Sequence, residues 1–157
     1  MKKIKQSWSH KLFFRINYRL GKRVWLDRMM HIFAHELLFV LAGLVFVWAA
    51  TVLFDRSPEN LNFFLKLLMT VGAFGLCTSW IIGLVFPHPR PIREFPNVKQ
   101  LITPLGSWKA FPSDHTIVSF TLAFVTIMQG VPLWFGTVLV FLAAAVSIGR
   151  IFAGVHY

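Results

Sequence analysis

The sequence predicts an all-α membrane protein, a multi-pass transmembrane helical bundle with about four spans. Of its 157 residues, 56% are hydrophobic and only 14% are charged, whereas a soluble domain of this size exposes far more charge. Several apolar runs also approach the ~20 residues that cross a bilayer as a helix. We expect a basic amphipathic segment at the membrane interface over residues 1–35, followed by one membrane domain over residues 36–157.

Four apolar runs are the expected spans, and the turns between them fix their directions. The runs cover residues 36–54, 62–86, 112–128 and 133–151. The turn at residues 129–132 is too short to cross a membrane, so the last two spans are antiparallel. The fourth span therefore ends on the face where the third begins, which is also the face where the second span ends.

Much of the positive charge lies in the N-terminal segment. Nine of the sixteen Lys and Arg residues fall between Lys2 and Arg28, where they alternate with aromatic and aliphatic residues. This pattern is typical of an amphipathic helix on anionic lipid headgroups, and a disordered basic tail is the alternative. Basic chains often bind nucleic acid, but here we expect the lipid bilayer as the partner and no nucleic acid.

Three polar clusters, far apart in the sequence, should meet on one membrane face. They cover residues 87–91 after the second span, 111–115 at the start of the third, and 149–157 at the end of the fourth. Arg90 and Arg150 carry planar guanidinium groups that match phosphate oxygens. Charged groups beside membrane helices are costly unless they pair or bind a ligand, so we expect these two to be functional.

The start of the third span has the features of an anion site. Pro112 suits a first helical turn and Ser113 is a good helix cap. Free backbone N–H groups around Ser113, Asp114 and His115 would then face an anion. His115 and His156 come from different spans and flank this site, which suggests a nucleophile and a general acid. The sequence contains no carboxylate-rich cluster, so we expect neither a metal nor another cofactor.

Each of these residues also has a structural interpretation when taken alone. Arg90 could anchor a helix at the interface, and Ser113 could serve only as a cap. A single histidine at a helix end is usually structural or solvated. We assign that interpretation to His10, His31, His35 and His88. The convergence of the other polar residues on one face favours function for them.

The three clusters resemble the motifs of a known family. Residues 111–115, Phe-Pro-Ser-Asp-His, resemble the second motif of the type-2 phosphatidic acid phosphatase/haloperoxidase superfamily. Arg90-Pro91 resembles the end of its first motif, and Arg150 with His156-Tyr157 resembles its third. Order and spacing agree over residues 36–157. The Pro-Arg-Pro and Phe-Pro-Ser-Asp-His forms are most similar to bacterial undecaprenyl-diphosphate phosphatases of the bacitracin-resistance type.

The resemblance implies a hydrolase that removes phosphate from a lipid phosphate or diphosphate through a phosphohistidine, without a metal. His156 would be the nucleophile, and His115 would protonate the leaving oxygen. The phosphate would be bound by Arg90, Ser113, Asp114, Arg150 and Lys109. The broad family has a lysine seven residues before the first-motif arginine, where this chain has Gly83. Lys109 or Arg93 could replace its charge.

Two further departures from the family pattern concern activity. Position 149 is glycine where the family commonly has serine. The family also continues with an aspartate that orients the nucleophilic histidine and with a final span, whereas this chain ends at Tyr157. We therefore expect little activity from the chain as given unless a partner completes the site, because a misoriented histidine costs orders of magnitude in rate. Robust turnover of a lipid diphosphate would contradict this expectation.

Two alternative functions and the membrane face stay open at this point. The lipid could be phosphatidate, phosphatidylglycerophosphate or lipid A, or the chain could be an inactive relative that only binds anionic lipid. We expect a multi-pass protein of the inner or plasma membrane. The positive-inside rule places the site in the cytoplasm, whereas the resemblance implies the outer face. Partial insertion of residues 24–35 would reconcile the two.

Overall fold

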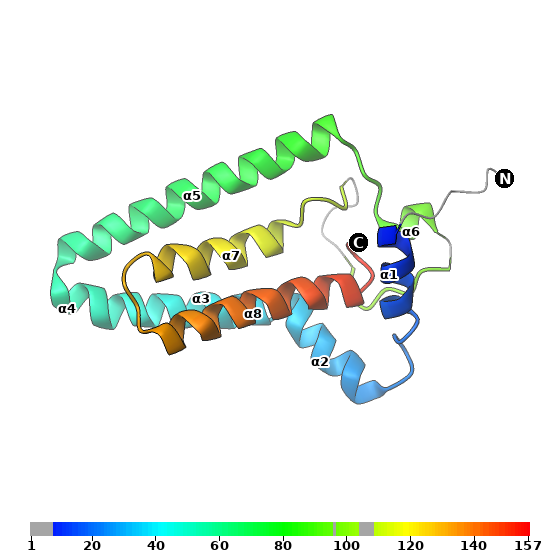
Figure 1. The fold of residues 1–157 in the computed structure, drawn as a ribbon, viewed down its shortest axis with the longest axis horizontal. Helices are drawn as coiled ribbons and strands as arrows, with labels where there is room; N and C mark the ends of the chain where they lie inside the picture. Colours follow the sequence, from blue (N-terminus) through cyan, green and yellow to red (C-terminus); the bar gives the residue numbers. More distant parts are fainter. Residues whose placement is uncertain (1–7, 96, 104–108) are drawn as a thin grey trace.

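The computed structural model describes residues 8–95, 97–103 and 109–157, and this part of the chain is helical and contains no strand (Figure 1). Its elements are α1 (Trp8–Asn17), α2 (Val24–His35), α3 (Leu37–Trp48), the π-helical segment η1 (Ala49–Leu53), α4 (Phe54–Arg56), α5 (Pro58–Val85), α6 (Pro91–Glu94), α7 (Asp114–Ile127) and α8 (Leu133–Phe152). The segments α3, η1 and α4 form one continuous helix of 20 residues. This architecture confirms the predicted all-α class.

Three helices in the described part of the chain are long and apolar enough to cross a membrane, namely Leu37–Arg56, α5 and α8. Helix α7 has only 14 residues, which at 1.5 Å per residue is about 21 Å, against ~30 Å for the hydrocarbon core. The predicted third span at 112–128 was therefore too long. Its helix begins only at Asp114, because Ser113 has an extended backbone with ψ 120°.

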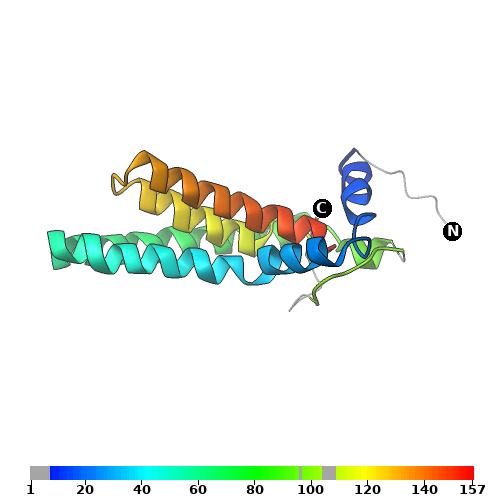
Figure 2. The ribbon, with the colours of Figure 1, turned by 90° about the horizontal axis from the view of Figure 1, so that it is seen from below.

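Helices α3, α5, α7 and α8 pack into a bundle whose interior is apolar. Helix α7 contacts α3, α5 and α8, so this short helix is the centre of the bundle (Figures 1 and 2). The buried side chains that fill the interior include Leu41, Val45, Phe64, Leu122 and Leu139. Large apolar side chains such as Phe39, Phe74 and Phe141 stay exposed on the outside, as expected for helices that face lipid.

The basic N-terminal segment forms two helices that pack on the bundle. Helix α2 packs against the last part of α8 and runs obliquely to it, while α1 lies crosswise at the same end of the bundle (Figures 1 and 2). Phe13 in α1 is only 1% exposed, so the apolar face of α1 is covered by protein rather than by lipid. Trp8 and Trp25 stay exposed and are available to an interface. The single interfacial helix that we expected is thus divided in two, with a turn at Gly21.

A close contact between α2 and α8 explains the glycine at position 149. A Cβ atom at Gly149 would lie 2.6 Å from the backbone nitrogen of Ala34 and 2.7 Å from the carbonyl carbon of Phe33. Only glycine allows this approach of the two backbones. The departure from the family's serine is therefore a consequence of where α2 packs.

Candidate active site

The predicted site residues gather at the end of the bundle where α5 ends, α7 begins and α8 ends (Figure 1). Arg90 directly precedes α6, Arg150 lies in the last turn of α8, and His156 follows α8 by four residues. These three side chains are buried, as is Lys109. Buried cations require a compensating anion, and Asp114 is the acid whose charge acts on both arginines.

Both arginines have an N–H group without a hydrogen-bond acceptor among the described residues. Arg90 donates through Nη1 to the carbonyl oxygen of Val155 at 3.3 Å, and Arg150 donates through Nη1 to that of Ala34 at 3.2 Å. The Nε atoms of both arginines and the Oγ atom of Ser113 are buried and have no hydrogen-bond partner among the described residues. Orphaned buried donors are costly. Three of them, two on guanidinium groups, are the features expected of a site for phosphoryl oxygens.

Ser113 differs in one respect from its predicted role as a helix cap. It occupies the N-cap position of α7, and its carbonyl oxygen accepts a hydrogen bond from the Ile117 N–H at 3.0 Å. Its hydroxyl, however, makes no capping hydrogen bond. The side-chain cap is therefore absent, and the hydroxyl is available as a donor to an anion.

The imidazole of His156 is held in one tautomer. Its Nδ1 atom lies 2.6 Å from the carbonyl oxygen of Ala110, and because a carbonyl only accepts, Nδ1 carries the proton and Nε2 keeps its lone pair. Burial lowers the pKa of His156 to about 3. The hydrogen bond to Ala110 opposes that shift, and the charges of Arg150, Arg90 and His115 add to it. His156 is therefore neutral at neutral pH, with a nucleophilic Nε2.

The hydrogen bond to Ala110 also bears on how His156 is oriented. A histidine nucleophile needs an acceptor on its second nitrogen to fix its orientation. Within this chain the carbonyl oxygen of Ala110 accepts that hydrogen bond.

His115 lies in the first turn of α7 and is half-buried. The charged groups that act on it most strongly are Arg150 and Asp114, followed by His35 and Arg90. Its own charge acts on His156. The structure thus brings both histidines and both arginines into one electrostatic cluster, as the directions of the predicted spans indicated.

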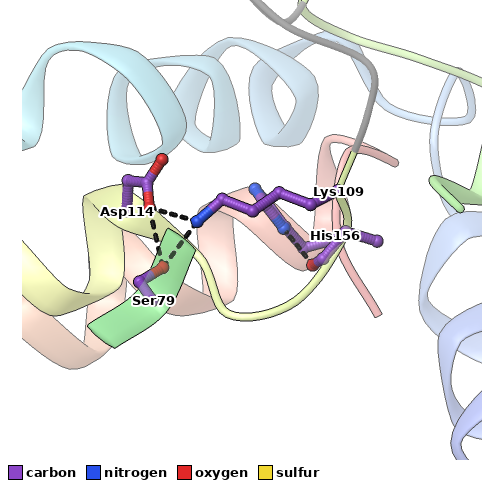
Figure 3. Close-up of polar contacts among 5 residues, drawn as sticks. Ser79, Lys109, Asp114 and His156 are labelled. Carbon is purple, nitrogen blue, oxygen red and sulfur yellow. Dashed lines mark hydrogen bonds and ion pairs between the residues drawn. The ribbon is translucent and has the colours of Figure 1, made fainter. Parts of the chain in front are cut away.

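Asp114 and Lys109, which we expected to bind phosphate, bind each other and Ser79 instead. Figure 3 shows the Lys109 ammonium group between the Asp114 carboxylate, at 2.6 Å, and the Ser79 hydroxyl, at 2.5 Å. The Ser79 hydroxyl also donates to Asp114 at 2.9 Å. The Asp114 carboxylate binds a cation and a hydroxyl, so the side chain does not suit a phosphate ligand. Arg93, the other predicted replacement charge, is exposed.

Ser79 and Glu94 are site-end residues that the sequence alone did not single out. Ser79 lies in α5, and its only signal was a polar residue near the site end of an apolar span. Glu94 ends α6 and accepts a hydrogen bond from the Tyr157 hydroxyl, and burial together with this carboxylate raises the pKa of Tyr157 above its usual value. His10 from α1 lies 4.0 Å from the same carboxylate. These contacts anchor the residue that follows His156.

These features define a class: a helical membrane protein with a buried cluster of cations beside a neutral imidazole. Within the described residues, no group of three or more His, Cys, Asp or Glu side chains could hold a metal ion. The chain belongs to the PAP2 superfamily, whose family model matches residues 63–157.

Two relatives and one solved structure are similar over most of the chain. YbjG of Escherichia coli, whose name proposes undecaprenyl-diphosphatase activity, is 30% identical over 149 residues, or 93% of this chain and 70% of YbjG. The bacitracin transport permease protein BcrC of Bacillus licheniformis is 33% identical over 149 residues, or 92% of this chain and 68% of BcrC. The crystal structure of LpxE from Aquifex aeolicus has a TM-score of 0.70 and 25% identity, covering 99% of this chain and 87% of LpxE. The predicted resemblance, and with it the class of membrane lipid phosphatase, is confirmed.

Proposed function

We propose that the protein hydrolyses undecaprenyl diphosphate to the monophosphate in a bacterial inner or plasma membrane, which it crosses more than once. The observation that carries the chemistry is the set of orphaned donors on Arg90, Arg150 and Ser113 beside the free Nε2 of His156. The choice of lipid is supported by the name of the E. coli relative and by the Pro-Arg-Pro and Phe-Pro-Ser-Asp-His forms of the motifs.

The site residues suit a two-step phosphoryl transfer. In the first step, Nε2 of His156 attacks the terminal phosphorus, the bond to the bridging oxygen breaks, and the protonated (imidazolium) form of His115 gives its proton to that oxygen. In the second step, neutral His115 takes a proton from water, the water oxygen attacks phosphorus, and the bond between phosphorus and Nε2 of His156 breaks, which releases inorganic phosphate and restores both histidines. Arg90, Arg150 and the Ser113 hydroxyl stabilise the charge on the non-bridging oxygens, which is the main requirement of this reaction.

The apolar surface beside the site suits a substrate that stays in the bilayer. Leu84 and Phe86 at the end of α5 are 72% and 63% exposed, and Phe111 before α7 is 60% exposed. These side chains face the surroundings next to the buried cations. A lipid headgroup can therefore enter sideways while its chain remains in contact with apolar side chains and lipid.

The test measures phosphate release by the protein in nanodiscs from undecaprenyl diphosphate, phosphatidate, phosphatidylglycerophosphate and lipid A. Because the Ala110 carbonyl oxygen accepts the hydrogen bond of His156, we expect turnover in place of the little activity expected from the sequence. The highest kcat/KM should be that for undecaprenyl diphosphate, and His156→Ala should lose turnover. His31→Ala is the matched control, because His31 lies outside the site and should keep activity. A higher kcat/KM for another lipid would refute the proposed substrate. Binding of these lipids without turnover by the parent protein would refute the enzyme.

A further inference from the structure

We propose that Lys109 is a positioning residue, whose ammonium group holds the Lys109–Ala110 backbone where the Ala110 carbonyl fixes the tautomer of His156. This inference rests on the proposed function, because it assigns a role in preparing the same nucleophile. Figure 3 shows the arrangement, with Lys109 reaching Ser79 and Asp114 on one side while its backbone lies beside His156.

The Lys109 side chain is fixed to two helices. It is only 4% exposed and donates to Ser79 on α5 and to Asp114 in the first turn of α7. A charge-assisted hydrogen bond to a carboxylate is among the stronger polar contacts in a protein. The long side chain of Lys109 therefore has a defined place, and so does the backbone that carries it.

The neighbouring residue, Ala110, connects the first and third motif regions. Its N–H donates to the carbonyl oxygen of His88 at 2.8 Å, and its carbonyl oxygen accepts from Nδ1 of His156 at 2.6 Å. Lys109 adds the second motif through Asp114. Two consecutive residues thus contact all three motifs, and a shift of Lys109 is transmitted directly to the acceptor of His156.

The geometry distinguishes this role from phosphate binding. The charge of Lys109 is neutralised by Asp114 at 2.6 Å, whereas the orphaned donors belong to Arg90, Arg150 and Ser113. An ammonium group that is paired with a carboxylate adds little net attraction for an anion. The position of Lys109 suits support of the nucleophile better than contact with the substrate.

The chemical consequence lies in the imidazole. If the Ala110 carbonyl shifts, Nδ1 of His156 loses its acceptor, and the proton can move to Nε2, which then cannot attack phosphorus. In a serine protease, the wrong histidine tautomer lowers kcat by about 10⁴-fold. The hydrogen bond from Ala110 to His88 remains when Lys109 is replaced, so we expect a smaller loss, about 10- to 100-fold in kcat.

The experiment compares Lys109→Met, Lys109→Arg, Asp114→Asn and the double variant Lys109→Met/Asp114→Asn in nanodiscs. Lys66→Met is the matched control, because Lys66 lies in the half of α5 remote from the site. Kinetics give kcat and KM, orthovanadate binding reports the anion site, and ¹⁵N NMR of histidine, assigned with His156→Gln, reports the tautomer. Ser79→Ala removes one contact without unpairing a charge, and it serves if Lys109→Met does not fold.

For Lys109→Met we expect kcat to fall by about 10- to 100-fold. KM and vanadate affinity should stay within about 3-fold of the parent, and the NMR signal of His156 should show a mixture of tautomers. Lys109→Arg should restore most of the rate, and the double variant should match Asp114→Asn, because both substitutions break one contact. Ser79→Ala should lower kcat by a smaller factor.

Three results would overturn the inference. Vanadate binding that weakens in step with kcat/KM would make Lys109 a phosphate ligand. An unchanged His156 tautomer, or an unchanged kcat in both Lys109→Met and Ser79→Ala, would remove the positioning role. The NMR and vanadate measurements require no turnover, so failure of the proposed substrate is distinguishable from failure of this inference.

Discussion

Replacement of Arg150 by methionine should separate ligand binding from folding. Arg150 is 5% exposed, its Nη1 donates to the Ala34 carbonyl at 3.2 Å, and its Nε has no described partner. Methionine keeps an apolar stem in the same space. Loss of the Arg150 charge leaves a desolvated phosphate oxygen of the bound ligand without its partner. We expect this to weaken binding by about 3–5 kcal/mol, which is about 10²- to 10³·⁵-fold in affinity and in kcat/KM.

The unliganded protein should respond much less. Loss of the hydrogen bond to Ala34 costs about 1–3 kcal/mol, but the substitution also removes a buried charge that Arg90 repels. We therefore expect a change in unfolding free energy within about 2 kcal/mol.

Thermal unfolding with orthovanadate makes this difference visible. At 100 times its Kd, a ligand stabilises the parent protein by about 2.7 kcal/mol. A variant with a 100-fold weaker Kd gains only about 0.4 kcal/mol at the same concentration. Arg150→Lys keeps the charge without the planar fork and should lie between the two. Equal stabilisation of parent and Arg150→Met by vanadate would refute an anion site at this arginine.

Three further predictions concern pH, packing and the end of the chain. Burial sets the pKa of His156 at about 3 against 6.5 when unfolded, so the unfolded state binds more protons in between. Stability should fall as the pH drops from 6.5 towards 3, by at most about 5 kcal/mol, and His156→Gln should flatten this decline. Gly149→Ala should lower the unfolding free energy by about 1–3 kcal/mol, while Gly72→Ala, in open space within α5, should raise it by up to about 1 kcal/mol. Tyr157→Phe removes the hydrogen bond to Glu94 and should lower kcat less than 10-fold, about 1 kcal/mol.

Denaturation at a series of pH values, thermal unfolding and steady-state kinetics check these three in turn. A pH slope between 6.5 and 3 that is as steep in His156→Gln as in the parent would assign the slope to another group. Equal effects of the two glycine substitutions would contradict the close contact of α2 and α8. A kcat loss above about 100-fold in Tyr157→Phe would exceed one hydrogen bond and give Tyr157 a larger role.

The sequence predicted the membrane bundle and the meeting of both arginines and both histidines for a simple reason. Helix length and the short turn at residues 129–132 determine which span ends share a face. Those span ends carry both arginines and both histidines (Arg90, His115, Arg150 and His156), so the directions of the spans were enough to place them together. No loop conformation had to be known.

Other features depend on loop and packing geometry that a single sequence does not encode locally. The Ala110 carbonyl contacts His156 across 46 positions, and Lys109 meets Ser79 across 30. Asp114 was predicted beside the phosphate on the strength of the backbone N–H groups around it, and the sequence did not indicate that its carboxylate binds Lys109. The burial of Phe13 likewise follows from the docking of α1 on the bundle, which amphipathic periodicity does not distinguish from docking on lipid.

The most direct test of the account is to trap the covalent intermediate. The protein in nanodiscs is mixed with undecaprenyl diphosphate carrying a radiolabelled terminal phosphate, quenched within milliseconds in alkali, digested and analysed by mass spectrometry. A phosphohistidine at position 156 should give acid-labile label on the peptide that contains His156, and His156→Gln should give none. Label on another residue, or turnover with no phosphorylated peptide at any time, would contradict it.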